Sequence, residues 1–261
     1  MRRGSFGAWL AVILGMVYFL APLVATFEFS LRMRRGEYSL DAYRSVFSSG
    51  DFQSSFLFSV ALALATIAIG VLLIVPTAYW VQLRLPKLRG LVEYITLLPL
   101  VIPGIVIVFG YIRLYNSSSI LPLTGSALGT DVLLTCGYVA LAMPYMYRAV
   151  ETGMRALDVR TLTEAAEIQG ASTPTILWRI ILPNIRASIL SGAFLSFAIV
   201  IGEFTFASLL NRPAFGPYLQ LTGANSAYEP AALAVMSFAL TWACMGLIQV
   251  LGAGARDGGA P

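Results

Sequence analysis

Long apolar segments are the feature that most constrains how this chain folds. A helix of about 20 largely apolar residues spans the hydrocarbon core of a bilayer. The sequence is 58% hydrophobic and only 11% charged, whereas soluble domains average about 45–50% apolar and about 25% charged residues. We therefore predict an all-α membrane protein in which residues 1–261 form a single transmembrane domain. Its six predicted spans cover about residues 7–27, 54–81, 91–114, 132–150, 187–210 and 231–252.

The distribution of basic residues predicts the orientation of these spans. Six spans place both termini on one side, and Arg and Lys are enriched in cytoplasmic loops. The loop after the first span is an exception, because it would be external yet contains four Arg. The remaining segments outnumber it, so we expect cytoplasmic termini and a multi-pass protein of the bacterial inner membrane. The basic residues that this orientation places inside are Arg2, Arg3, Arg84, Lys87, Arg89, Arg148, Arg155, Arg160, Arg179, Arg186 and Arg256.

Missing residue types exclude several functions. The sequence has no His, which excludes imidazole acid–base catalysis and His-ligated metal sites. Its one Lys, Lys87, lies in "LRLPKLRG", which does not have the P-loop pattern of an ATPase. The Arg residues are scattered, so nothing favours nucleic-acid binding. We predict no catalytic residue and no metal or cofactor bound by this chain.

Prolines recur inside the predicted spans. Helix breaks within a bilayer are tolerated where protein or a water-filled cavity satisfies the freed backbone groups. The prolines therefore predict interrupted or kinked spans in a protein that lines a pathway. They are Pro76, Pro99, Pro103 and Pro144.

A polar loop over residues 151–186 separates the fourth and fifth spans. Thr161 and Glu164 have the spacing of a capping box, which predicts a short helix that starts near Leu162. Gly170 is suited to end that helix in a left-handed conformation. Ser172 or Thr173 then caps a second helix, with Pro174 in its first turn and Pro183 closing it. The apolar face of this second helix comprises Ile176, Leu177, Ile180 and Ile181.

Two interpretations of this helix pair are open from local chemistry alone. Small residues at its tip permit close approach by a partner, and Glu164 and Glu167 are able to pair with the partner's Arg. Alternatively, Glu164 only caps its own helix and the loop merely connects two spans.

Seven positions of the loop resemble a known family signature. The pattern is E-A-A, three residues, G, nine residues and then I-x-L-P, and it is similar to the signature loop of ATP-binding-cassette importer permeases, the binding-protein-dependent inner-membrane components. The resemblance extends from about the second span to the C-terminus. The matching residues are Glu164, Ala165, Ala166, Gly170, Ile180, Leu182 and Pro183.

This resemblance implies a type I importer permease fold and a division of labour with other chains. The loop would be a coupling helix that sits in a cleft of a cytoplasmic ATPase dimer, where ATP and Mg²⁺ would be bound. Glu164 would contact the ATPase, Ala165 and Ala166 would fit its groove, and Gly170 would set the bend. A second, similar permease chain and an extracytoplasmic substrate-binding protein would complete the importer in the membrane lipid.

Glu203 is the only carboxylate well inside a predicted span, and an ionisable group at that depth is by default a functional candidate. It either lines the translocation path and attracts a cation, or pairs with an Arg such as Arg113 and holds the helices together. Asp131 and Glu229 lie near outer span ends, as expected of ordinary rim charges. Tyr111, Tyr115 and Phe206 have positions typical of interfacial belt aromatics.

The segments "GEFTFASLL", "FGPYLQ" and "YSLDAYRSVFSSGDF" are similar to permeases of the spermidine/putrescine subfamily. A carboxylate on the path would suit a polycation. We therefore predict a polyamine such as spermidine or putrescine as the substrate. Permeases for sulfate, molybdate, ferric iron or phosphonate share much of the same pattern, so these substrates stay open as alternatives.

Three other classes fit less well. A proton- or sodium-coupled secondary transporter would be expected to carry several intramembrane acids or an inverted repeat. A membrane enzyme requires clustered catalytic groups, and a scaffold gives no reason for the seven-position match.

Overall fold

The computed structural model describes residues 5–34 and 36–253, and every regular element within them is a helix. Arg2, Arg3 and Arg256, which entered the orientation argument, lie outside the described residues, as does Arg35. The chain forms two compact units. The first comprises residues 1–54 and 218–242, and the second comprises residues 55–217 and 243–261.

The first unit is built on two long apolar helices. α1 (Ser5–Ser30) buries none of its apolar window within the structure, so its side chains require lipid or another chain as surroundings. The unit also contains α2 (Asp41–Ser48), the end of α12 (Phe215–Asn225) and most of α13 (Glu229–Ala253). Phe29 of α1 stacks on Tyr228 just before α13, with ring centroids 4.9 Å apart.

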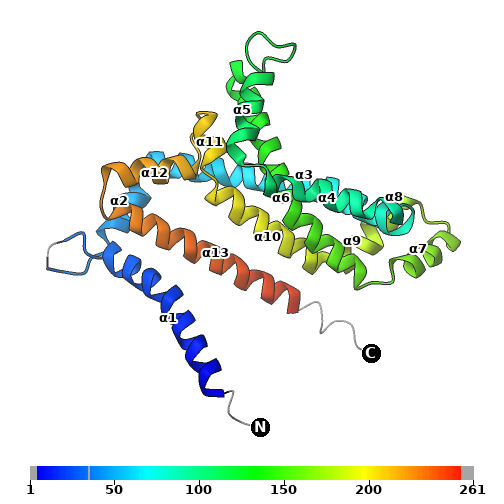
Figure 1. The fold of residues 1–261 in the computed structure, drawn as a ribbon, viewed down its shortest axis with the longest axis horizontal. Helices are drawn as coiled ribbons and strands as arrows, with labels where there is room; N and C mark the ends of the chain where they lie inside the picture. Colours follow the sequence, from blue (N-terminus) through cyan, green and yellow to red (C-terminus); the bar gives the residue numbers. More distant parts are fainter. Residues whose placement is uncertain (1–4, 35, 254–261) are drawn as a thin grey trace. The chain divides into compact units, whose positions relative to one another are not determined.

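The second unit contains the remaining helices. Within it, α7, α8 and α9 gather at one end of α3, α4 and α6, while α11 lies beside α5 (Figure 1). α6 and α10 approach closely because glycines face the contact; a Cβ on Gly153 would lie 2.4 Å from Ser188 Oγ. The helices are α3 (Gly50–Leu83), α4 (Arg89–Val101), α5 (Gly104–Leu114), α6 (Ala127–Arg155), α7 (Val159–Ile168), α8 (Thr173–Ile176), α9 (Leu182–Asn184), α10 (Arg186–Gly202) and α11 (Thr205–Leu209).

The predicted third span is not one helix. α4 and α5 meet at a bend of 94°. The cause is Pro103, because a residue before proline is driven out of the helical region, and Ile102 accordingly has φ −84° and ψ 118°. Pro76, Pro99 and Pro144 lie inside α3, α4 and α6 without ending them. The prediction that proline interrupts a span is therefore confirmed at Pro103 only.

The predicted continuous helix over 187–210 is also wrong. α10 ends at Gly202, and Glu203 adopts an extended conformation before α11 begins. Among the described residues, three helices are long and apolar enough to span a bilayer: Gly7–Ser30, Gly50–Leu83 and Ala127–Arg155. The number rises to five if each sharply bent helix pair counts as one span. The count of six stays a prediction.

Candidate functional site

α7 begins three residues earlier than the capping-box pattern predicts. The carboxylate of Asp158 accepts a hydrogen bond from the backbone N–H of Thr161 at 3.2 Å and from the Thr161 hydroxyl at 2.6 Å. These bonds lower the pKa of Asp158 below its usual range. Asp158 is thus the N-cap, and the prediction that Thr161 caps the helix is wrong, because an aspartate in the preceding turn supplies the acceptor first.

The end of α7 is confirmed at Gly170. This glycine has φ +79°, a left-handed conformation that side chains with a Cβ disfavour. Its N–H bonds to the carbonyl of Glu167 at 2.9 Å, and the N–H of Ala171 bonds to the carbonyl of Ala166 at 3.0 Å. This pair of bonds is the Schellman motif, which satisfies the last carbonyls of a helix.

The second helix of the predicted pair starts as expected and then changes character. Ser172 is the N-cap of α8, and its hydroxyl hydrogen-bonds the Thr175 hydroxyl at 2.9 Å. A π-helical turn follows over Leu177–Ile181, and α9 continues one residue past Pro183 to Asn184. The chain then bends by 78° into α10.

The two alanines of the signature, Ala165 and Ala166, differ in their exposure to solvent. Ala165 is exposed, whereas Ala166 is buried with 8% of its surface accessible. Ile168, one turn along from Ala165, is 87% exposed, which is unusual for a large apolar side chain on a polar helix. The exposed face of α7, comprising Glu164, Ala165 and Ile168, is therefore open to a partner, while Ala166 packs inside this chain.

The buried face of α7 belongs to a core shared with α3, α6 and α8, which we call the coupling-end core. The Tyr79 hydroxyl hydrogen-bonds Thr163 Oγ1 at 3.2 Å, and Gln82 Nε2 donates to the carbonyl of Met154 at 3.2 Å. α7 is consequently packed against both long helices. The buried members of this core are Ile74, Val75, Ala78, Tyr79, Met146, Tyr147, Val150, Met154, Val159, Ala166, Ile176, Leu177, Ile181 and Ile185.

The acidic residues of α7 pair within the chain. Glu164 accepts a hydrogen bond from Arg160 Nε at 2.8 Å, one turn earlier on the same helix, and this raises the pKa of the Arg160 guanidinium. Glu167 lies 3.9 Å from Arg84, beyond the end of α3. Glu164 remains largely exposed, with 59% of its side-chain surface accessible.

Glu203 caps α11. One carboxylate oxygen accepts from the backbone N–H of Phe206 at 2.9 Å, and the other accepts from the N–H of Ala207 at 3.3 Å. Among the described residues Glu203 forms no ion pair, so the predicted pairing with Arg113 is not present. A role for Glu203 on a translocation path stays a prediction.

Phe206 is completely buried, so its assignment as an interfacial belt residue is wrong. Its ring lies against two glycines: a Cβ on Gly104 would be 2.9 Å from Phe206 Cε2, and one on Gly137 would be 2.4 Å from Cε1. We call the surrounding cluster the Phe206 core. Its buried members are Leu62, Ala63, Val108, Leu133, Leu134, Tyr138, Val200, Phe206, Ala207, Leu210 and Ala214.

Asp131, which the sequence predicts to be an ordinary charge at the rim of a span, forms an ion pair with Arg212. Its two carboxylate oxygens accept from Nε and Nη2 of Arg212 at 2.6 and 2.9 Å, a bidentate geometry that adds specificity as well as strength. The Arg212 guanidinium also lies 5.5 Å from the ring centroid of Phe58. The sequence carries no signal for this pair, because its members are far apart in the chain.

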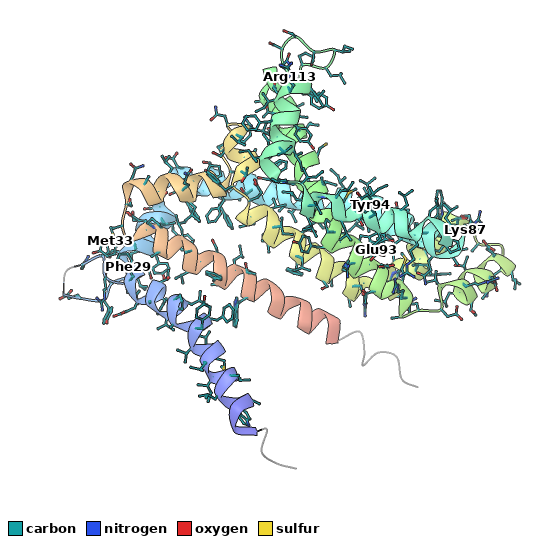
Figure 2. The ribbon with its side chains drawn as sticks, in the orientation of Figure 1. Phe29, Met33, Lys87, Glu93, Tyr94 and Arg113 are labelled. Atoms are coloured by element: carbon teal, nitrogen blue, oxygen red, sulfur yellow. The ribbon has the colours of Figure 1, made fainter. Side chains whose placement is uncertain are left out.

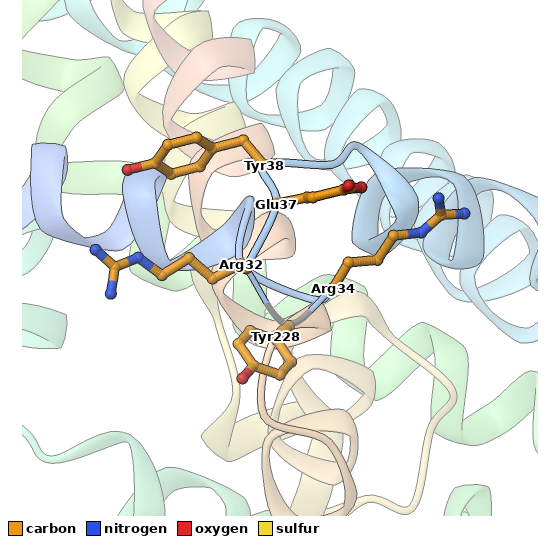
Figure 3. Close-up of a pocket in the computed structure, with 6 residues that line it drawn as sticks. Arg32, Arg34, Glu37, Tyr38 and Tyr228 are labelled. Atoms are coloured by element: carbon orange, nitrogen blue, oxygen red, sulfur yellow. The ribbon is translucent and has the colours of Figure 1, made fainter.

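A cavity of about 370 Å³ lies in the first unit. It is lined by Arg32, Arg34, Glu37, Tyr38 and Tyr228, together with Gly36 (Figure 3). Arg32 pairs with Glu28 and Arg34 with Asp41, and the two guanidinium groups point away from each other (Figure 3). The cavity therefore does not concentrate positive charge on one ligand.

The arrangement of these apolar helices, two pairs of which are sharply bent, is that of the type I importer permease fold. The chain belongs to the family of binding-protein-dependent transport system inner membrane components, whose model matches residues 39–253. It is accordingly a multi-pass importer permease subunit, a class of transport subunit rather than of enzyme.

Relatives with different substrates share this fold family. The chain is 30% identical to the molybdenum transport system permease protein ModB of Mycobacterium bovis, covering 95% of this chain and 93% of that protein. It is also 30% identical to the spermidine/putrescine transport system permease protein PotB of Haemophilus influenzae, but only over 52% of this chain and 50% of that one.

Solved structures show the same fold at low identity. A bacterial ABC transporter involved in the import of the acidic polysaccharide alginate has a chain that matches with TM-score 0.70 and 15% identity, covering 97% of this chain and 94% of that chain. Another structure of a bacterial alginate ABC transporter, in complex with an alginate pentasaccharide-bound periplasmic protein, matches with TM-score 0.70 and 13% identity, covering 93% and 91%.

Proposed function

We propose that this chain forms half of the translocation path of an ATP-driven importer and receives the force of a separate cytoplasmic ATPase through α7, α8 and α9. The ATPase would bind ATP and Mg²⁺, and this chain would bind no cofactor. A second, similar permease chain would form the other half of the path. An extracytoplasmic binding protein would deliver the substrate, with both termini of this chain in the cytoplasm.

One observation carries the coupling part of the proposal. The exposed face of α7 presents Ala165 and the 87%-exposed Ile168, while the opposite face is buried in a core with α3 and α6. An apolar side chain held out on a rigid, doubly capped helix is suited to fill a groove on another protein. Because Ala166 and Thr163 fix α7 to the long helices, pressure on its outer face reaches the membrane spans.

The test compares two exposed isoleucines. Ile168→Glu should reduce co-purification of the ATPase at least tenfold and abolish substrate-stimulated ATP turnover, because it places a charge in the proposed contact. Ile120→Glu is the matched control, since Ile120 is fully exposed in the loop between α5 and α6. Equal ATPase retention by the two variants would refute coupling through α7.

The charge of Glu164 gives a second test of the same contact. Glu164→Arg should weaken ATPase association if Glu164 contacts an Arg of the partner. Glu164→Gln separates this from the intrahelical pair with Arg160, because it removes the ion pair without introducing repulsion. Reduced association in both variants in equal measure would favour a role for the intrahelical pair with Arg160 over a contact with the partner.

For the substrate, an oxyanion of the molybdate type is better supported than a polyamine. The molybdenum permease relative matches over nearly the whole chain, whereas the polyamine permease relative matches over about half of it. Glu203, the carboxylate that would attract a polycation, is engaged by two backbone N–H groups. We propose that it positions α11.

Thermal-shift measurements on the partner binding protein test the substrate class. A stabilising shift with molybdate or sulfate and none with spermidine is expected, and the reverse pattern would reinstate the polyamine. In uptake assays Glu203→Gln should alter transport of any substrate similarly, because it weakens the cap of α11. A loss confined to cationic substrates would instead place Glu203 on the path.

A further inference from the structure

The C-terminal ends of two candidate spans, α3 and α6, line the same cavity in the second unit. α3 ends at Leu83 and α6 ends at Arg155, and a cavity of about 200 Å³ lies between these ends. Its polar lining comes from α3, α4 and α6. The residues that matter for its chemistry are Gln82, Arg89, Tyr147, Glu151 and Arg155.

The charges in this cavity do not cancel. Arg89 Nη2 lies 3.0 Å and Arg155 Nη2 lies 2.8 Å from the same oxygen, Glu151 Oε1. Two guanidinium groups therefore share one carboxylate, which leaves one net positive charge. The nearby Glu93 does not neutralise it, because Glu93 has its own partner in Arg148 at 3.8 Å.

The two arginines of the cavity are more exposed than the carboxylate that they share. Each guanidinium carries five N–H groups, of which Glu151 engages only a part. The side chains of Arg89 and Arg155 are 44% and 51% exposed, whereas that of Glu151 is 16% exposed. The shared carboxylate is thus mostly covered, while a large part of each arginine side chain stays accessible to an anion.

Exposed apolar side chains lie next in the chain to two residues that line the cavity, Pro86 and Arg89. Leu85, Leu88 and Leu91, in and around the connection from α3 to α4, are 43%, 43% and 55% exposed. Trp80 and Tyr94 are 53% and 65% exposed, as expected for aromatic side chains at the level of lipid headgroups. Figure 2 shows Lys87 near the end of this segment and Tyr94 further along α4.

We propose that this cavity binds the headgroup of an anionic phospholipid. The phosphate would take the free donors of Arg89 and Arg155, and the acyl chains would cover the exposed leucines. A free phosphate ion satisfies the arginines but leaves the exposed leucines of the α3–α4 connection in water, so the combination of the two features favours a lipid. Basic pockets between spanning helices at the cytoplasmic surface are suited to such headgroups.

The test uses the purified importer complex in nanodiscs of phosphatidylcholine with increasing phosphatidylglycerol, with bound lipid counted by native mass spectrometry. Arg155→Gln should lower phosphatidylglycerol binding about fivefold, the effect expected for one basic residue near the surface. Glu151→Gln should raise it, because it frees both arginines. Lys87→Gln is the control for general surface charge and should change binding less than twofold.

Opposite effects of the Arg155 and Glu151 variants separate a binding role from a structural one, since a broken ion-pair cluster would weaken the protein in both. Effects of the same sign, or a Lys87→Gln effect as large as that of Arg155→Gln, would overturn the proposal. So would stabilisation in detergent by inorganic phosphate that depends on Arg155 and is not reproduced by phosphatidylglycerol, because the ligand would then be a free anion.

Discussion

The second unit has two buried cores that differ in the side chains from which they are built. The coupling-end core is aliphatic for the most part and draws residues from α3, α6, α7 and α8. The Phe206 core is arranged around one ring, which Gly104 and Gly137 admit between α5 and α6. In the second core two glycines make room for one aromatic ring, whereas the first is built mainly from aliphatic side chains of four helices.

The difference follows from how each short helix is held. α7 is capped at both ends by local bonds from Asp158 and Gly170, so its shape does not depend on the core alone. α11 has only five residues, too few to be stable by itself, and depends on Glu203 and on the insertion of Phe206. α7 is therefore held by its own caps as well as by the core, whereas α11 depends on its tertiary context alone.

The largest expected effect is at Phe206. Phe206→Ala should destabilise the purified protein by about 3 kcal/mol, at the low end of soluble-core values because apolar surroundings also solvate the unfolded reference state. The measurement is thermal unfolding in a fixed detergent. Ile176→Ala is the matched change in the coupling-end core, where Ile176 is also fully buried; it should cost less stability but weaken ATPase association. Equal stability losses and equal association would remove the distinction between the two cores.

The next effect concerns the space beside the ring. Gly137→Ala should destabilise by about 1–3 kcal/mol, because the added methyl group would overlap Phe206 and overpacking is costly. Gly110→Ala is the control, since a Cβ there would meet no atom within 4 Å. In the combined Phe206→Leu and Gly137→Ala variant the cost should be smaller than the sum of the two single changes. Additive costs would show that the ring and Gly137 do not share the space.

A smaller effect is expected at the end of α7. Gly170→Ala should cost about 1 kcal/mol, since alanine is strained at a positive φ while the site itself has room for a Cβ. Gly170→Asn should cost less, because asparagine tolerates the left-handed conformation. Hydrogen exchange of the α7 amides measures both. Equal protection in the alanine variant and the wild type would contradict a rigid cap at this position.

The smallest effect is at Asp158 and depends on pH. Its pKa is lowered in the folded state by the bonds from Thr161, so the ionised carboxylate stabilises the fold above its unfolded pKa of about 3.9, and this contribution is lost as the pH falls through the folded pKa. Asp158→Ala should therefore melt at a lower temperature than the wild type at pH 7, with a difference that narrows below about pH 4. A constant difference across this range would refute the ionised cap.

Much of the helix pair could be predicted from sequence because its signals are local. Gly170 and Pro174 act on the local backbone and Ser172 bonds the nearby Thr175 hydroxyl, and the structure places all three as predicted. The start of α7 was misplaced because Asp158 and Thr161 are both able to cap, and the pattern alone does not rank two local acceptors. The helix break at Pro103 also has a local signal, the proline itself. The helix break at Glu203 has none, because it lies within a continuous apolar segment.

The roles of Phe206, Ala166, Arg212 and the Arg89–Glu151–Arg155 cluster were not available from sequence. Each depends on a partner distant in the chain: Phe206 on Gly104 and Gly137, and Arg212 on Asp131. The periodicity of apolar residues predicts that a residue is buried, but it does not identify the residues that pack against it. In a chain that is apolar almost throughout, the periodicity also fails to separate residues that face lipid from residues that face the core.

The sequence by itself determined the class of this protein: long apolar runs require membrane helices, and a polar, capped helix pair between them with the importer signature gives the permease family. Only the tertiary structure decided which face of α7 is free, that Phe206 is completely enclosed, and where two arginines share one carboxylate. Helix formation and capping are set by bonds between near neighbours, whereas burial and electrostatic pairing are set by contacts that exist only once distant segments have packed together.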